Sequence, residues 1–112
     1  MDASLFLSPI ALITTTVGSA ADAERLAQAA VQAQLAACAQ IEGITSHYVW
    51  EDQLAHSAEW RVVLKTLPDA VAPLWAWLQA AHPYDVPQLL LRTEHAEAAY
   101  AAWVADHVKI EK

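Results

Sequence analysis

Two stretches, IEGITSHYVW at residues 41–50 and EWRVVLKT at residues 59–66, decide the fold. In both, alternate residues can be assigned to opposite faces, and this period of two is that of a β-strand. In the second stretch Val62 and Leu64 share one face, and charged side chains occupy the other. Residues 51–57 between the stretches are polar and predict a turn. Together the two stretches predict a long β-hairpin.

Helices and further strands are expected on both sides of the hairpin. β-Branched residues predict a strand, strong helix formers predict a helix, and proline marks helix ends. The expected elements are a strand at 10–16, a helix at 20–36, the hairpin, a helix from Pro68 to His82, a strand at 88–93 and a C-terminal helix at 94–108. With the hairpin counted as two strands, the six elements before the C-terminal helix follow the order of the split βαβ motif. We therefore predict an α+β, ferredoxin-like βαββαβ fold with an added C-terminal helix. We expect one domain at 10–108, an N-terminal extension at 1–9 and a tail at 109–112.

Length and composition favour self-association. A chain of 112 residues makes one small domain, and 56% of its residues are hydrophobic. Small domains have a high surface-to-volume ratio, so burying apolar surface between subunits would stabilise them. The formal net charge of −7 repels phosphate backbones, and we therefore expect no nucleic acid partner.

The sequence favours a cytoplasmic location without membrane insertion. Cys38 is the single cysteine, so the fold needs no oxidising compartment. The first residues lack the basic region of a signal peptide. No apolar stretch reaches the roughly 20 residues that span a bilayer.

Four short strings, taken in order, resemble one known family. They are LAAC at 35–38, SHYVW at 46–50, Glu59 followed by KT at 65–66, and HPYDVP at 82–87. Their order and spacing are similar to those of the CutA-type divalent-cation tolerance proteins, over residues 10–103. The resemblance implies a trimer-forming ferredoxin-like fold with sheets of neighbouring subunits packed together.

The resemblance also implies a function. The family is linked to tolerance of divalent metals, copper in particular, so we expect a homotrimer that binds or answers to such ions. The trimers of the family are similar to PII signalling proteins, which makes a small-ligand signalling module the first alternative. The second alternative is an acid–base enzyme that uses Glu59, Lys65 and His82. No nucleophile or phosphate-loop motif supports an enzyme, and no obligatory cofactor is expected beyond a divalent metal or copper.

Two residues are candidate metal ligands. Cys38 would suit Cu(I) as a thiolate, or it is a small buried residue at the helix–strand junction. His82 would be a ligand or a general base, or it is a histidine that ends a helix. The other histidines, at 47, 56, 95 and 107, lack the i, i+4 spacing of a helical metal site.

Five residues are candidates for a ligand cleft between subunits. Glu59 and Lys65 would supply charged contacts, and the aromatic wall would come from Tyr48, Trp50 and Tyr84. The alternatives are cross-strand ion pairs for the charges and subunit packing for the aromatic rings.

The chain departs from the family pattern at two informative positions. Asp52 stands where the family usually has glycine, which implies a different hairpin turn. Gln88 stands where the family usually has glutamate, so a site that needs a negative charge there is altered.

Overall fold

The computed structural model describes residues 5–110. Along the chain, its elements are β1 (Leu7–Val17), α1 (Ala20–Gln32), β2 (Cys38–Trp50), β3 (Gln53–Thr66), a 3₁₀ turn (Pro68–Ala70), α2 (Val71–Ala81), β4 (Leu90–Glu97) and α3 (Ala98–Asp106). Parts of the expected N-terminal extension and tail, residues 1–4 and 111–112, lie outside the described residues. β1 begins inside the range expected for the extension.

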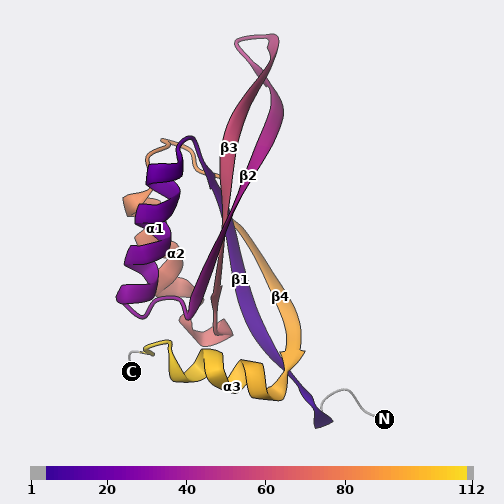
Figure 1. The fold of residues 1–112 in the computed structure, drawn as a ribbon, viewed down its shortest axis with the longest axis vertical. Coiled ribbons are helices and arrows are strands. Elements are labelled where there is room, and N and C mark those ends of the chain that lie inside the picture. The colour runs from indigo at the N-terminus through magenta and orange to yellow at the C-terminus, as the bar shows by residue number, and fades with distance from the viewer. Residues whose placement is uncertain (1–4, 111–112) are drawn as a thin grey trace.

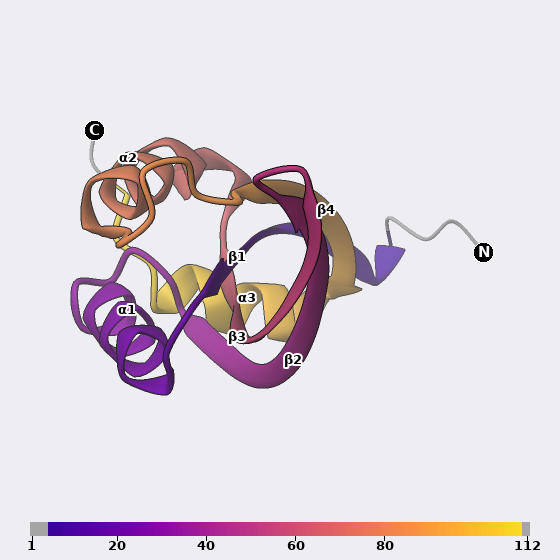
Figure 2. The ribbon, with the colours of Figure 1, turned by 90° about the horizontal axis from the view of Figure 1, so that it is seen from above.

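The four strands form one sheet in the order β2-β3-β1-β4, and every neighbouring pair is antiparallel. This order, with a helix after β1 and another after β3, is that of the ferredoxin-like fold, and the predicted fold class is confirmed. Figure 1 shows α1 and α2 together beside the sheet, and α3 lying across its lower end. In the view from above, in Figure 2, α1 and α2 again lie side by side.

The central strand β1 is buried on both faces. Ile13 and Val17 lie in the larger core with Leu26 of α1 and Leu78 of α2. Ile10 and Leu12 alternate with them and belong to a second cluster, which contains Ala101 and Val104 of α3. Because successive side chains of a strand point to opposite faces, α3 covers the face away from α1 and α2.

The β2–β3 hairpin is longer than predicted and its turn is shorter. Cross-strand pairs run from Cys38 opposite Lys65 to Trp50 opposite Gln53. Only Glu51 and Asp52 connect the strands, with φ values of 51° and 63°. Two positive φ values are typical of a type I′ turn, whose twist matches that of the strands. The predicted turn at 51–57 was therefore wrong, and residues 53–57 belong to β3.

The start of the C-terminal helix was also predicted too early. Residues 94–97 continue β4, because β1 extends to Leu7 and pairs with them as far as Glu97. The helix begins only at Ala98, whose N–H donates to the carbonyl of Phe6. In contrast, the end of α2 agrees with the prediction, since His82 is extended (ψ 137°) and Pro83 follows it.

Across residues 5–110, the helices all fall short of the length and apolar character that a membrane crossing requires.

Candidate functional site

A pocket of about 750 Å³ lies between the outer part of the hairpin and the loop that follows α2. The hairpin contributes Tyr48, Trp50, Ser57 and Glu59, and the loop contributes Pro83, Tyr84, Asp85 and Val86. The lining thus combines aromatic rings with two carboxylates and contains no lysine or arginine. Such a surface suits a small molecule that carries hydrogen-bond donors or positive charge.

Tyr84 ties the loop to the hairpin. Its hydroxyl donates a hydrogen bond to Glu59 Oε2 at 2.9 Å. Burial raises the pKa of Tyr84 to about 12, and the hydrogen bond to Glu59 contributes in the same direction. The phenol therefore stays protonated near neutral pH and remains a donor. Gly18 makes room for it, because a Cβ at that position would lie 3.0 Å from the Tyr84 hydroxyl oxygen.

His82 holds the start of the same loop against β1. Its Nδ1 accepts a hydrogen bond from the Tyr84 main-chain N–H at 3.0 Å. Its Nε2 lies 3.0 Å from the Thr16 carbonyl oxygen and 2.9 Å from Thr15 Oγ1. Because an accepting Nδ1 carries no proton, the ring is neutral with its hydrogen on Nε2. Burial lowers the pKa of His82, which favours the same neutral form.

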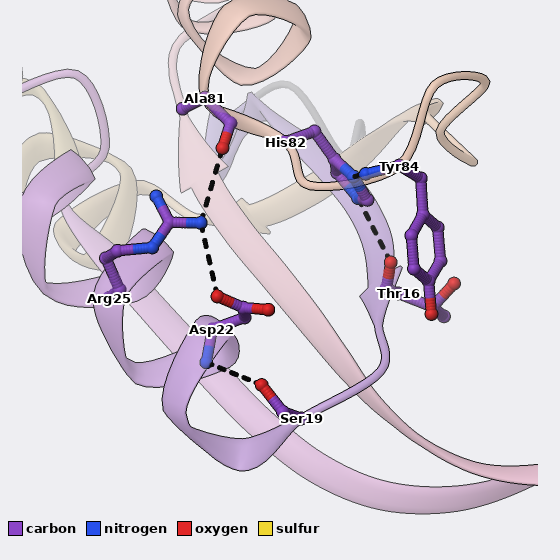
Figure 3. Close-up of polar contacts among 7 residues, drawn as sticks. All are labelled: Thr16, Ser19, Asp22, Arg25, Ala81, His82 and Tyr84. Carbon is purple, nitrogen blue, oxygen red and sulfur yellow. Dashed lines mark hydrogen bonds and ion pairs between the residues drawn. The ribbon is translucent and has the colours of Figure 1, made fainter.

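Figure 3 shows how the ends of α1 and α2 meet beside this histidine. Ser19 caps α1 by accepting a hydrogen bond from the Asp22 N–H at 3.1 Å. Arg25 reaches from α1 to Asp22 and to the carbonyl of Ala81, the last residue of α2. These contacts hold the start of the pocket loop against the first helix.

Four of the five predicted cleft residues line the pocket, namely Tyr48, Trp50, Glu59 and Tyr84. Lys65 lies elsewhere. It is six residues from Glu59 along β3, which corresponds to roughly 20 Å. Its ammonium lies 3.4 Å from the hydroxyl of Tyr100 in α3 and 5.4 Å from the centre of that ring.

Cys38 and His82 are not brought together within one chain. Cys38 opens β2 opposite Lys65. His82 contacts Thr16, which is paired with Arg61, four residues away from Lys65 on β3. Both ring nitrogens of His82 are already engaged, so this imidazole does not fit the role of a metal ligand. Nor do residues 5–110 hold three or more histidine, cysteine or acidic side chains gathered as a metal cluster.

The acid–base arrangement of Glu59, Lys65 and His82 is likewise absent from a single chain. Lys65 lies at the far end of the strand from Glu59, and His82 is held by main-chain groups. We therefore find no acid–base site formed by these three side chains within residues 5–110.

Gln88, the residue that stands in place of a glutamate, lines a second hollow of about 580 Å³ with Arg61 and Arg92. Its side-chain oxygen lies 3.3 Å from the hydroxyl of Thr16, which donates to it. Both arginines have carboxylate partners, Glu42 at 2.7 Å and Glu94 at 3.2 Å respectively.

Sequence reasoning missed several residues of the site. Ser57 was assigned to a turn, whereas in β3 its Oγ lies 3.2 Å from the hydroxyl of Tyr48. Asp85 and Val86 belong to the family-like string but were not singled out. Thr15 and Thr16 carried no signal, because hydroxyl side chains in a strand core are recognised only through a partner such as His82.

The CutA1 divalent ion tolerance protein family matches residues 11–107. The chain belongs to the CutA1 family. The divalent-cation tolerance protein CutA of Escherichia coli O139:H28 is 36% identical over 95 residues, which cover 83% of this chain and 85% of that protein. The relatives' names state tolerance of divalent cations and name no reaction.

Solved CutA structures share the fold. CutA from Synechococcus elongatus superposes with a TM-score of 0.88 at 35% identity, covering 96% of this chain and all of that one. A second structure of that protein is complexed with a Bis-Tris molecule, with a TM-score of 0.82 and 37% identity, covering 90% of this chain and 95% of that one. The Archaeoglobus fulgidus relative, named a periplasmic divalent cation tolerance protein, has a TM-score of 0.83 at 27% identity, covering 89% and 99%.

Proposed function

We propose that this CutA1-family chain acts as a homotrimer in tolerance of, or response to, divalent metal ions, copper in particular, through weak metal binding. The observation that carries the proposal is the family match over residues 11–107. The formal charge of −7 supports it, because a negative surface raises the local concentration of cations.

Exposed apolar side chains support self-association. Val49, Trp50 and Leu54 at the outer end of the hairpin are 70%, 67% and 81% exposed. Leu90 and Leu91 of β4 are about half exposed, at 55% and 51%. The hairpin projects well beyond the helices (Figure 1). Clustered apolar surface of this kind marks a protein–protein interface, and a further copy of the chain would cover it.

Light scattering during gel filtration tests the assembly. The expected mass is three times the 12.2 kDa of one chain. Calorimetric titration with Cu²⁺ and Zn²⁺, with Cys38 kept reduced, tests metal binding. A monomer that releases no heat at high metal concentration would contradict both halves of the proposal.

A second candidate function is binding of a small organic ligand, as in a PII-like signalling module. It is supported by the pocket around Glu59 and Tyr84 and by the Bis-Tris complex of the Synechococcus relative. Titration with Bis-Tris, followed by tryptophan fluorescence, tests it. Glu59→Gln is expected to weaken the response, and Glu94→Gln, on β4, is the matched control. Equal responses in both variants would remove this candidate.

A cytoplasmic location remains part of the proposal. It is supported by Cys38, which is a free cysteine. Since the Archaeoglobus relative is named periplasmic, fractionation of cells that express the full chain is the deciding measurement, and recovery in the periplasm would contradict it.

A further inference from the structure

The hairpin places two histidines directly opposite each other. His47 of β2 is paired with His56 of β3, and their ring centres are 5.5 Å apart with an angle of 31° between the rings. Both side chains are exposed. They lie nine residues apart in the sequence and come together only because the turn is two residues long.

The spacing of these rings fits a shared metal ion. Directly opposite residues of an antiparallel pair have Cβ atoms about 4.5–5.5 Å apart. Imidazole nitrogens bind zinc at about 2.0–2.1 Å, so two nitrogens on one ion lie roughly 3 Å from each other. Rotation of two exposed side chains brings one nitrogen of each ring to that separation, and no movement of the paired backbone is needed.

We propose that His47 and His56 form a two-imidazole site for a borderline divalent cation, with Cu²⁺ bound most tightly and Ni²⁺ and Zn²⁺ more weakly. Imidazole is a good ligand for all three ions, and Cu²⁺ leads the general order of affinity. Only two side chains hold the ion and water completes the coordination, which makes the site weak. The site lies on the same hairpin face as the Val49–Leu54 pair, next to the surface proposed above for a further copy. The inference rests on the proposed function, because it names the residues that would bind the metal.

The remaining histidines in the described part of the chain are less suited to such a site. The ring nitrogens of His82 are engaged by Thr16 and the Tyr84 main chain. His107 packs on Trp103, with Nδ1 2.8 Å from the carbonyl oxygen of that residue. His95 of β4 faces Pro9 across the strand pair, so no imidazole stands opposite it.

The charge around the pair also favours a cation. The turn residues Glu51 and Asp52 follow His47 by four and five positions, and both are exposed carboxylates. They add negative potential at the same end of the hairpin, which raises the local concentration of metal ions and supports capture by a weak site.

Titration of the full chain with Cu²⁺, followed by electron paramagnetic resonance and calorimetry, tests the proposal. We expect one Cu²⁺ per chain with two nitrogen ligands. His47→Ala and His56→Ala should each weaken binding at least about tenfold, since losing a ligand costs no less than losing an outer-shell partner. The double variant should bind little worse than either single one, because one imidazole alone cannot chelate. His95→Ala is the matched control and should bind as the parent does.

A second measurement separates binding from folding. Ni²⁺ should raise the melting temperature of the parent chain and not that of the variants, because an ion that binds only the paired strands stabilises them. If an alanine variant folds poorly, His47→Thr and His56→Thr replace it in the same titrations, because threonine is a good strand former.

Two results would overturn the inference, and they differ in what else they remove. If the parent binds Cu²⁺ and the His47 and His56 variants bind it equally well, the site is wrong and the proposed function stands. If the parent binds no divalent ion, the site and the metal-binding part of the proposed function both fail.

Discussion

The main-chain N–H of Tyr84 donates a hydrogen bond to Nδ1 of His82 at 3.0 Å. This contact makes the neutral imidazole part of the loop structure, because a protonated Nδ1 would be a second donor facing the N–H. The other nitrogen is held by the Thr16 carbonyl. The loop that lines the pocket is thus linked to the protonation state of one buried side chain.

The folded protein should lose stability as the pH falls below about 6.5. Burial lowers the pKa of His82 in the folded state from 6.5, so the unfolded chain binds the proton more readily. The contribution of His82 is complete above that pH and is lost as the pH falls toward the lowered folded-state pKa. Urea unfolding at a fixed protein concentration measures the effect. His82→Gln should show a shallower pH dependence than the parent chain, and an identical slope in both would contradict the assignment.

Removing the Tyr84 hydroxyl should loosen the pocket loop at a small energetic cost. Tyr84→Phe deletes the hydrogen bond to Glu59, and hydrogen bonds contribute about 0.5–1.5 kcal/mol. We expect the low end of that range, because water can solvate the exposed carboxylate. Chemical denaturation gives the free energy, and proton exchange at the loop amides reports the loosening. Tyr100→Phe, which keeps its ring under Lys65, is the control and should leave this loop unchanged.

Asp52→Gly should stabilise the hairpin. Asp52 has a φ of 63°, a conformation that glycine adopts without the steric cost of a Cβ. The expected gain in unfolding free energy is about 0.5–1 kcal/mol. It is smaller than the steric cost that is removed, because glycine loses more conformational entropy on folding than aspartate does. Asp52→Ala removes the charge and keeps the Cβ, so it should bring no gain. If alanine stabilises as much as glycine, charge rather than backbone strain is responsible.

Ser19→Ala should destabilise the protein by about 0.5–2 kcal/mol, because it removes the side-chain oxygen that caps α1. Ser19→Asp retains a capping oxygen and should keep most of the stability. Thermal unfolding of the two variants beside the parent distinguishes them, and equal losses would show that packing at this position matters more than the cap.

The order of elements and the inward faces could be predicted from the sequence, because burial leaves a periodic pattern. Val62, Leu64 and Leu78 repeat with the spacing of their strand or helix and are fully buried. Pro83 likewise marked the end of α2, since proline restricts the residue before it.

The outer half of the hairpin could not be read in that way. Beyond the helices neither face of the strands is buried. Residues 53–57 include no buried side chain, and Leu54, the one large apolar residue among them, is 81% exposed, so their sequence looks like a loop. Because residues 51–57 were assigned to a turn, two contacts could not be predicted. They are the contact of Ser57 with Tyr48 and the pairing of His47 with His56. A strand register counted from a two-residue turn would have given the histidine pair.

The candidate site was predictable only in part. The aromatic residues and Glu59 were found because the hairpin and the proline-flanked loop stood out in the sequence. Lys65 shares a strand face with Glu59, yet sequence gives no measure of how far along the strand the pocket extends. The engagement of His82 Nε2 depends on the path of β1, from which Thr15 and Thr16 reach the ring. Its Nδ1 is engaged by the Tyr84 main chain, two residues further along.

The two-residue turn also has a consequence for the order of folding. Pairing of β2 with β3 starts between Trp50 and Gln53 and proceeds between chain neighbours, so it requires little loop closure and hairpins of this kind form in microseconds. β4 pairs with β1 through contacts such as Leu12 with Arg92, which lie far apart along the chain and form more slowly. We expect the hairpin to be a nucleus and the Tyr84 loop, anchored between α2 and β4, to settle last. Half of the pocket wall would then form at the start of folding and the other half at its end.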